Sequence, residues 1–570
     1  MHTPDTQPRP SIYYNYRVHS PWLASEHPKQ DRKPVLIVGS GPAGLVTALE
    51  LARYGVASVV VTAELQVSQG SRAIVFTRRS MEILQQVGVA HRLSEHGLPW
   101  RFGNSFYRGQ AVFRMEAPHD EDDRFFPMIN LQQQYLEEYL LDACAATGLV
   151  EVRWGNKLVE VSQQDGFVQA HIDTPEGIYS LDADWLVAAD GGRSGLRSQL
   201  NLKMEGASYE GFFVIADIKI DLPYPTERRA YFDPDWNRGN TILMHREPHG
   251  IWRIDYQLPE GESPEDALRP ESLKARIDAQ LAMIGHAGTP WEMDWSSVYS
   301  ARTLTLPNFV HGHVIFTGDA AHLLPIFGVR GANTAFQDAQ SLGWHLAFVI
   351  KGWASPALLS NHSRERVGAA REIIEEAGKS TRFMAPPKGG FELLRNAVLS
   401  LSLTQEFVRP LYHWRTSRPH AYTDSALNCA QDDDALFAAG PSHGAPPQNV
   451  RMADNTYLLD HVGGGFDLLC FTHQTNLDSE VVALVQRYQA QGIPIRLTAI
   501  GNSPVVEGAH QVLLDSQGHI AKRYGIDLQS LSTRCAAYSE HRPSRFERPG
   551  RRQAQRQVND LASSSEPLPL

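Results

Sequence analysis

Residues 34–44 read Pro34-Val-Leu-Ile-Val38 and then Gly39-Ser-Gly-Pro-Ala-Gly44. A continuous β-branched apolar run is typical of a parallel strand that is covered on both faces. Residues 45–54 follow with apolar side chains at helical spacing, Gly55 ends that pattern, and residues 57–61 form a second β-branched run. Strand, glycine turn, helix and strand in this order predict the βαβ unit that opens a doubly wound α/β domain.

The glycines of this turn have separate tasks. Gly39 permits the tight turn, Gly41 lets the backbone approach a pyrophosphate, and Gly44 lets the helix pack closely on the strand. Together with Pro42 and Ala43, they place the free N–H groups and the positive dipole end of a helix beside bound phosphates. The pattern favours a dinucleotide site over a turn without a ligand, but it does not distinguish FAD from NAD.

Composition narrows the classes of protein and partner. The chain has 570 residues, 42% of them hydrophobic, and 53 Lys and Arg against 64 Asp and Glu give a net charge of −11. The length allows two to four domains, and the acidity argues against a nucleic-acid partner. The four cysteines include no CxxC pair and no zinc spacing, which predicts a cytoplasmic protein without a metal site. The sequence suggests no signal peptide, and its apolar runs are too short to span a membrane.

Two further blocks decide the family. The first is Asp190-Gly-Gly-Arg-Ser-Gly-Leu-Arg197, which follows a strand-like run. The second begins at Gly318-Asp-Ala-Ala-His322 and continues to Gly331-Ala-Asn333, where a long apolar helix is expected. With the glycine turn, these blocks resemble the FAD-dependent aromatic-ring hydroxylases over residues 34–371. That family of flavoprotein monooxygenases includes p-hydroxybenzoate hydroxylase, phenol hydroxylase and 3-(3-hydroxyphenyl)propionate hydroxylase.

The resemblance implies an α/β fold with three parts: a Rossmann-type FAD-binding domain, an antiparallel-sheet substrate domain inserted into it, and a C-terminal thioredoxin-like domain. The expected segments are an N-terminal arm at 1–32, the first part of the FAD-binding domain at 33–203, the substrate sheet at 204–300, the second part with long helices at 301–420, a linker at 421–449, a thioredoxin-like domain lacking CxxC at 450–540, and a disordered tail at 541–570.

The resemblance also implies how the flavin is held at its ring and ribityl end. Asp319 is expected to accept a hydrogen bond from the ribityl chain. The peptide N–H groups of Ala332 and Asn333, at the helix start that follows Gly331, favour negative charge on the reduced flavin. His322 in the same block is expected to be structural.

Other positions match the family's contacts with the nucleotide half. Arg72 and Gln133 match residues that touch the adenosine diphosphate and ribityl sides, and Asp190 belongs to the same set, although it also serves its own turn. The second strand ends in Thr62, where the family has an acidic residue for the adenine ribose. Glu64 is a substitute for that contact, and the choice between these two stays open.

The inserted sheet is expected to form the roof over the substrate. A phenol hydroxylase needs a group to take the phenolic proton, and His245 and Tyr256 have that chemistry. Arg246 and Arg253 have the geometry to pair with a substrate carboxylate through two hydrogen bonds. Because side chains alternate along a strand, adjacent residues cannot all face the substrate.

The implied activity is hydroxylation of a phenolic or other electron-rich aromatic compound. In the family's scheme NAD(P)H reduces FAD, O2 forms a flavin C4a-hydroperoxide, and the distal oxygen attacks the ring. The single glycine motif predicts that NAD(P)H binds transiently, and a homodimer is expected. The alternatives are epoxidation or tailoring hydroxylation of a larger aromatic on the same scaffold, and a non-catalytic flavin-bearing binding component.

Overall fold

The computed structural model describes most of the chain up to residue 524. The described residues are 1–27, 30–70, 73–325, 327–387, 389–412, 419–428, 443–452, 454–472, 477, 479–501, 510–514 and 520–524. Arg72, the middle of the predicted linker at 429–442 and the predicted tail at 541–570 therefore lie outside the described residues.

A mainly parallel sheet forms the centre of the nucleotide-binding part, and the predicted βαβ unit at residues 34–61 is confirmed. Strand β1 pairs in parallel with β2 on one side and with β11 on the other. The helix α1 (Pro42–Arg53) connects β1 to β2. The sheet runs β17 (Val310–His311), β18 (Val314–Phe316), β11 (Gly177–Ala188), β1 (Lys33–Val38), β2 (Ser58–Val61) and β8 (Val150–Arg153), with β9 (Lys157–Gln164) and β10 (Phe167–Thr174) joined through β11.

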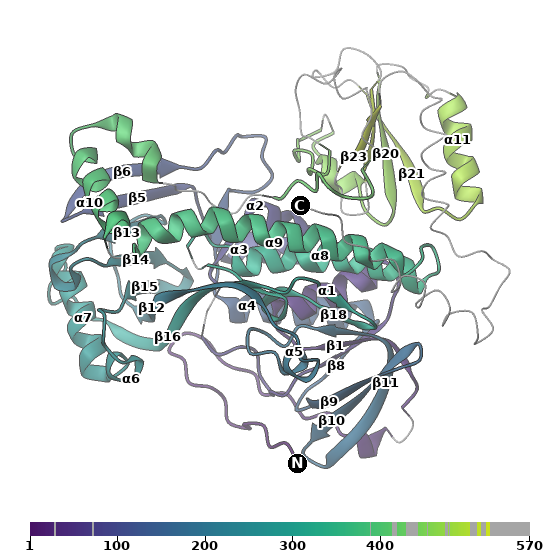
Figure 1. Ribbon diagram of the computed structural model, residues 1–570, viewed down its shortest axis with the longest axis horizontal. Helices are drawn as coiled ribbons and strands as arrows, with labels where there is room; N and C mark the ends of the chain where they lie inside the picture. The colour runs from purple at the N-terminus through teal and green to yellow at the C-terminus, as the bar shows by residue number, and fades with distance from the viewer. Residues whose placement is uncertain are drawn as a thin grey trace, which may run out of the picture.

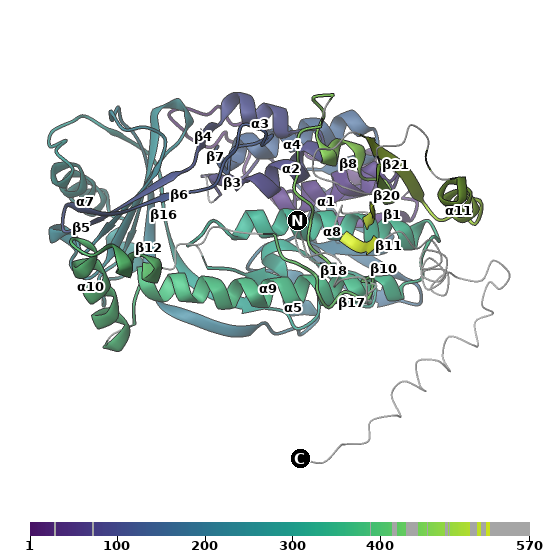
Figure 2. The ribbon, with the colours of Figure 1, turned by 90° about the horizontal axis from the view of Figure 1, so that it is seen from above.

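A second large sheet lies at the other end of the molecule (Figure 2). All its neighbouring strands are antiparallel except β13 and β5, which run parallel. Two of its strands come from residues 102–116, outside the expected substrate segment of 204–300. The order is β19 (His322–Leu323), β16 (Glu292–Thr305), β12 (Glu205–Lys219), β15 (Ile251–Gln257), β14 (Thr241–Arg246), β13 (Arg228–Phe232), β5 (Phe102–Tyr107) and β6 (Gln110–Glu116).

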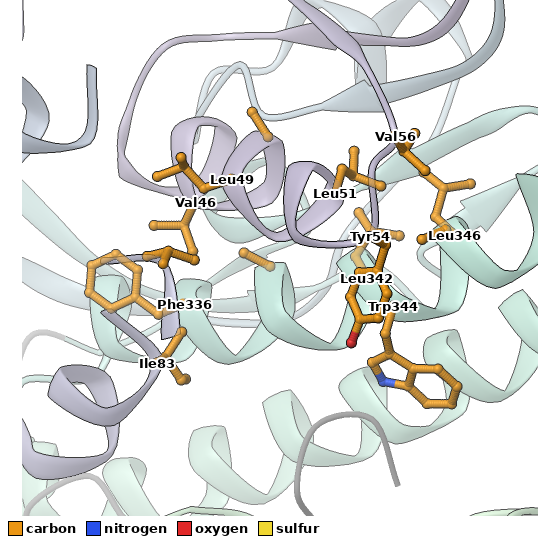
Figure 3. Close-up of a cluster of buried hydrophobic side chains, with 14 of the residues drawn as sticks. Val46, Leu49, Leu51, Tyr54, Val56, Ile83, Phe336, Leu342, Trp344 and Leu346 are labelled. Carbon is orange, nitrogen blue, oxygen red and sulfur yellow. The ribbon is translucent and has the colours of Figure 1, made fainter. Parts of the chain in front are cut away.

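Long helices connect the two sheets (Figures 1 and 2). The helix α8 (Gly331–Ile350) packs along α1, and α9 (Ala357–Met384) runs from the parallel sheet to the second sheet. Figure 3 shows apolar side chains of α1 and α8 meeting in one cluster. At their closest approach a Cβ on Gly343 would lie 2.4 Å from Cβ of Glu50, so only glycine fits there. This packing fixes where α8 begins relative to the glycine turn.

Smaller elements complete this part of the molecule. A three-stranded sheet lies beside the second sheet, and seven further α-helices of the described residues lie around the sheets. They are β3 (Val75–Thr77), β4 (Leu98–Trp100), β7 (Met128–Asn130), α2 (Arg78–Gln86), α3 (Ala90–His96), α4 (Gln133–Thr147), α5 (Gly195–Gln199), α6 (Pro264–Ala267), α7 (Pro270–Met283) and α10 (Gly390–Ser402). None of the helices in the described ranges combines the length and apolar character needed to cross a bilayer.

A C-terminal unit packs against the outer side of α8 (Figure 1). Its mixed sheet has the order β21 (Ile495–Gly501), β20 (Phe466–Thr472), β22 (His510–Leu514) and β23 (Ile520–Tyr524), with α11 (Ser479–Ala490) between β20 and β21. The ring of Phe466 lies 6.4 Å from that of Trp344 and 6.2 Å from that of Phe348, both on α8. The thioredoxin-like character of this unit stays a prediction.

The N-terminal segment lies against the loop that follows β2. His19 donates its backbone N–H to Leu65, and Arg9 donates to the carbonyl of Val67 at 2.7 Å. Ser11 donates its hydroxyl to Asp294 on β16 at 2.7 Å. The segment therefore connects the edge of the parallel sheet to the second sheet.

Candidate functional site

The start of α1 has the geometry of a phosphate-binding turn. Gly39 has φ of +113°, and a Cβ there would lie 2.3 Å from the carbonyl oxygen of Ala189. A Cβ on Gly44 would lie 2.0 Å from the carbonyl oxygen of Gly39, whereas a Cβ on Gly41 would meet no atom within 4 Å. No side chain caps the helix, and Pro42 occupies its first turn. Its N–H groups and the open space over Gly41 therefore suit a phosphate group.

The two other sequence blocks meet this turn. Gly318, with φ of +58°, approaches Ala43 so closely that a Cβ on it would lie 2.9 Å from the Ala43 methyl group. Arg197 donates to the carbonyl of Ala320 at 3.1 Å and to that of Gly192 at 2.8 Å, which ties the two blocks together. Asp319, between Gly318 and Ala320, is exposed. Its carboxylate is therefore accessible beside the start of α1.

A strained turn leads into α8. Gly328 has φ of +98° and Val329 has φ of +55°, a conformation that a β-branched residue rarely adopts. The helix begins at Gly331, as predicted, and no side chain caps its N-terminus. Gly331 and Ala332 are half-buried, whereas Asn333 is buried and accepts hydrogen bonds from Thr77 and Ser80. The Asn333 side chain is therefore used to anchor the helix, and the backbone N–H groups remain the candidate flavin contact.

A buried network fixes the block at 318–322 on α8. His322 contacts Asp338 at 2.6 Å, and Asp338 accepts a second hydrogen bond of 2.6 Å from Arg366 on α9. Arg366 also donates to the hydroxyl of Tyr422 at 2.7 Å. Burial alone would raise the pKa of Asp338, but Arg366 and His322 lower it below its ordinary value. This geometry supports a structural role for His322.

We expect Asp338→Asn to destabilise the fold by about 3–5 kcal/mol, because it leaves the buried Arg366 without its counter-charge. Since the pKa of Asp338 is lower in the folded than in the unfolded chain, the ion pair stabilises fully above about pH 4 and loses its effect as the pH falls through the folded value. Thermal melting of both proteins between pH 3 and 8 measures this. The exposed Glu406→Gln is the control, and equal melting of D338N and wild type would refute the role.

Three other residues that were predicted to contact FAD form hydrogen bonds or ion pairs within the protein. Gln133 accepts from the Ala73 backbone at 3.1 Å and donates to Glu137 at 2.7 Å, so its amide group already has partners within the protein. Asp190 accepts from the backbone N–H of Leu196 at 3.1 Å, which holds its own turn. Glu64 is half-exposed and pairs with Arg9 at 2.8 Å. The adenine-ribose contact of Glu64 therefore stays a prediction.

Strand register divides the second sheet into two faces. The outer face packs on α7, and its apolar cluster includes Met244, Ile254 and Ile277. The inner face looks the other way and carries the residues that alternate with these. Across it Arg228 on β13 stands opposite His245 on β14, His245 opposite Arg253 on β15, and Arg253 opposite Asp217 on β12. We call Arg228, His245, Arg253 and Asp217 the charged row.

The four predicted substrate residues fall on different faces. His245 and Arg253 lie in the charged row on the inner face. Tyr256 belongs to the outer cluster, with its ring 5.7 Å from that of Trp236. Arg246 stands opposite Trp252 of that outer cluster and donates to the carbonyl of Tyr224 at 2.9 Å. The structure therefore does not bring Tyr256 and Arg246 together with His245.

Arg253 is held in a buried ion pair. Its Nε and Nη2 donate to the two carboxylate oxygens of Asp217, both at 2.8 Å. The exposed fractions of the two side chains are 2% and 1%. Glu247 adds a third contact at 3.5 Å, and burial together with Asp217 raises its pKa well above the ordinary value, an effect that Arg253 opposes. The charge of Arg253 is therefore already matched within the protein.

Two acceptor atoms on the inner face stand out. Among the described residues, Nδ1 of His245 and Oδ1 of Asp255 are buried and have no hydrogen-bond partner. Burial, together with Arg228 and Arg253, lowers the pKa of His245 well below its usual value. Burial raises the pKa of Asp255 to about 7, with Arg253 opposing and Asp217 reinforcing the shift. Asp255 was not predicted from the sequence as a site residue. Only the pairing of β15 with its neighbouring strands shows that Asp255 lies on the same face as the charged row, two residues after Arg253.

Aromatic rings link this face to the start of α8. Phe327, four residues before Gly331, packs edge-on against Phe213 at 5.4 Å, and Phe213 stacks on Tyr299 at 5.7 Å. Asp255, in the middle of the sheet, and Tyr299 both keep part of their surface open. The inner face therefore combines an apolar wall, buried polar atoms without hydrogen-bond partners, among them His245 Nδ1 and Asp255 Oδ1, and proximity to the turn before α8.

Comparison with known proteins agrees with this geometry. Residues 32–377 match the family model described as FAD binding domain. The chain is 26% identical over 443 residues, 77% of each chain, to the 3-(3-hydroxy-phenyl)propionate/3-hydroxycinnamic acid hydroxylase of Mycolicibacterium smegmatis.

Solved structures show the same fold. The flavin-dependent monooxygenase PieE, in complex with FAD and substrate, matches with a TM-score of 0.74 and 22% identity, over 90% of this chain and 99% of that one. Aklavinone-11 hydroxylase, in complex with FAD and aklavinone, matches with a TM-score of 0.73 and 23% identity, over 90% of this chain and all of that one.

The open glycine turn, the accessible Asp319 and the two uncapped helix starts suit FAD, because they offer backbone donors for phosphate at one place and for the flavin ring at another. The family model covers more than half of the chain, and the fold predicted from the sequence agrees with the solved structures. The chain therefore belongs to the FAD-binding domain family, and its predicted membership of the FAD-dependent aromatic hydroxylases, a class of flavoprotein monooxygenases, is confirmed.

Proposed function

We propose that this protein is an NAD(P)H- and O2-dependent monooxygenase that hydroxylates a phenolic or other electron-rich aromatic ring. The observation that carries the proposal is the pair of unpartnered buried acceptors, His245 Nδ1 and Asp255 Oδ1, on the inner face of the sheet beside the turn before α8. A site that binds only apolar surface would not leave such atoms without partners, because each buried polar atom without a hydrogen bond costs about 1–3 kcal/mol of folding free energy.

FAD, when bound, supplies the redox chemistry that activates oxygen. The chain's own residues position the ring and move its proton. Since burial lowers the pKa of His245, its imidazole is neutral at pH 7 and has a lone pair that accepts the hydrogen bond of the phenolic hydroxyl. We assign to Nδ1 the uptake of the phenolic proton as the ring is attacked. The resulting phenolate pushes electron density onto the ring carbon that receives oxygen. The apolar side chains of Phe213, Leu243 and Phe327 exclude water from this space.

The same proposal includes the cosubstrate, the oligomeric state and the role of the C-terminal unit. With one glycine-rich dinucleotide motif, NAD(P)H would bind transiently, in the cytoplasm, to a homodimer. Among the residues that the structure describes, no group of three His, Cys, Asp or Glu side chains could hold a metal ion. The C-terminal unit, thioredoxin-like and without CxxC, would act as a structural or interface module, which agrees with its packing on α8.

The test is oxidation of NADH and NADPH by the purified yellow holoprotein, with and without a panel of phenols and larger aromatics. We expect at least one aromatic to accelerate oxidation and to gain one oxygen atom by mass spectrometry. If FAD binds tightly but no aromatic gains oxygen, the proposal fails, and the alternative of a non-catalytic flavin-bearing component is favoured. Conversion of only large polycyclic aromatics would favour a tailoring reaction.

A further inference from the structure

We propose that the Asp217–Arg253 ion pair and Asp255 make this site select uncharged phenols with a second hydrogen-bond donor, and reject rings that carry a carboxylate. This inference rests on the proposed function, because it assigns the inner face to the aromatic substrate. It separates this chain from the relative in Mycolicibacterium smegmatis, whose name specifies carboxylate-bearing substrates.

The guanidinium group of Arg253 is already occupied by a protein carboxylate. Arg253 donates to both oxygens of Asp217 at 2.8 Å, and neither side chain is accessible to solvent. A substrate carboxylate would have to displace Asp217 and leave that charge buried without its partner. Breaking a buried pair in this way costs several kcal/mol, which exceeds what one new ion pair returns.

The other charged side chains of the inner face are also matched within the protein. Glu247 also contacts Arg253, and Asp255 lies one register step away on the same strand. Arg228, the remaining cation of the charged row, is buried and interacts electrostatically with Asp255. An additional carboxylate would therefore enter a space in which each cation of the charged row already has an acidic neighbour, and would gain no unmatched positive charge.

The inner face offers two buried atoms to hydrogen-bond donors of a substrate. His245 Nδ1 and Asp255 Oδ1 are the buried acceptors without partners among the described residues of the charged row and its neighbour Asp255. His245 stands opposite Arg253 and Asp255 stands opposite Leu243, so the two acceptors lie diagonally across β14 and β15. Diagonal neighbours are close enough for one aromatic ring to reach both. A ring with two O–H or N–H groups satisfies both atoms, and a ring with one donor satisfies only one.

The matched ligands are 3-hydroxybenzyl alcohol, which is neutral with two donors, 3-hydroxybenzoate, which carries a carboxylate, and 3-methylphenol, which has one donor. Binding to the holoprotein is measured by the change in the visible absorbance of FAD, without NAD(P)H, so that no turnover is needed. We expect 3-hydroxybenzyl alcohol to bind at least about tenfold more tightly than either of the other two, which corresponds to about 1.4 kcal/mol.

Two variants test whether the carboxylates of Asp217 and Asp255 cause this binding preference. Asp217→Asn frees Arg253, so the preference should shift at least about tenfold toward 3-hydroxybenzoate. Asp255→Asn keeps the Arg253 pair intact and removes the acidic neighbour of Arg228, so it tests the charge balance even if D217N fails to fold. It should also improve binding of 3-hydroxybenzoate. Asp266→Asn in the first turn of α6 is the matched control and should leave the ratio unchanged. Retained FAD content shows which variants are folded.

The inference is overturned if wild type binds 3-hydroxybenzoate as tightly as 3-hydroxybenzyl alcohol, if no ring binds, or if the folded variants keep the wild-type ratio. Measuring the hydroxylated product formed with NAD(P)H tests the proposed function independently of the binding preference. The predicted binding order without any hydroxylated product supports the inference and refutes the hydroxylase. Hydroxylation with a preference for the carboxylate ring supports the hydroxylase and refutes the inference.

Discussion

Gly41→Ala is expected to weaken FAD binding about 100-fold, or about 2.7 kcal/mol, while leaving the folded apoprotein intact. The backbone of Gly41, with φ of −72° and ψ of 176°, suits any residue, and a Cβ there meets no protein atom within 4 Å. The added methyl group therefore does not disturb the chain itself. It occupies the space through which the backbone would approach the pyrophosphate.

Two neighbouring substitutions make this result specific. In Gly44→Ala the new Cβ would lie 2.0 Å from the carbonyl oxygen of Gly39, so the apoprotein itself should lose stability. Gly368→Ala, within α9, adds a methyl group that meets no atom within 4 Å outside the backbone of its own helix, and it should be neutral or slightly stabilising. FAD titration and melting of the three apoproteins measure both effects. Wild-type affinity in G41A would show that the pyrophosphate lies elsewhere.

His245→Gln is expected to lower kcat/KM for a phenol about 100- to 10,000-fold, the range that a general base contributes. Glutamine keeps much of the side-chain volume but cannot take the proton. Because burial lowers the pKa of His245, wild-type kcat/KM should be flat near pH 7 and should decrease only as the pH falls well below 6.5 and the imidazole becomes protonated. This acid limb should be absent from the pH profile of H245Q.

The same sheet provides the matched control. Tyr256 lies on the outer face, in the cluster that packs on α7, where its ring lies beside Arg276 of that helix rather than beside the charged row. Tyr256→Phe should therefore keep wild-type kcat/KM and pH dependence. A large loss of activity in Y256F together with a mild effect in H245Q would reverse the assignment of the two faces.

Local features of the sequence predicted the fold well. The βαβ unit depends on an apolar run, a glycine turn and a helix within about 30 neighbouring residues, and each of these is a short-range signal. The start of α8 at Gly331 was predicted in the same way, because glycines and small residues in that block indicate a tight turn that leads into a helix. The buried contact of His322 with Asp338 likewise agrees with its expected structural role.

The substrate face could not be predicted to the same degree, because it depends on strand register. Alternation shows that His245 and Arg246 face opposite sides, but not which side meets the flavin. The sequence predicts that Arg253 pairs with a substrate carboxylate, and only the pairing of β15 with β12 shows that Asp217 lies beside it. Glu64 meets Arg9 because the N-terminal segment folds back along the loop after β2, a long-range contact without a signal in the sequence.

The most direct test of the account is a crystal structure of the protein with FAD and a phenol that it hydroxylates. We predict that the aromatic ring lies between the inner face of the sheet and the start of α8, with its phenolic oxygen about 2.6–3.2 Å from Nδ1 of His245. A ring bound on the outer face beside Tyr256, or an oxygen whose only protein partner is Arg246, would contradict the account.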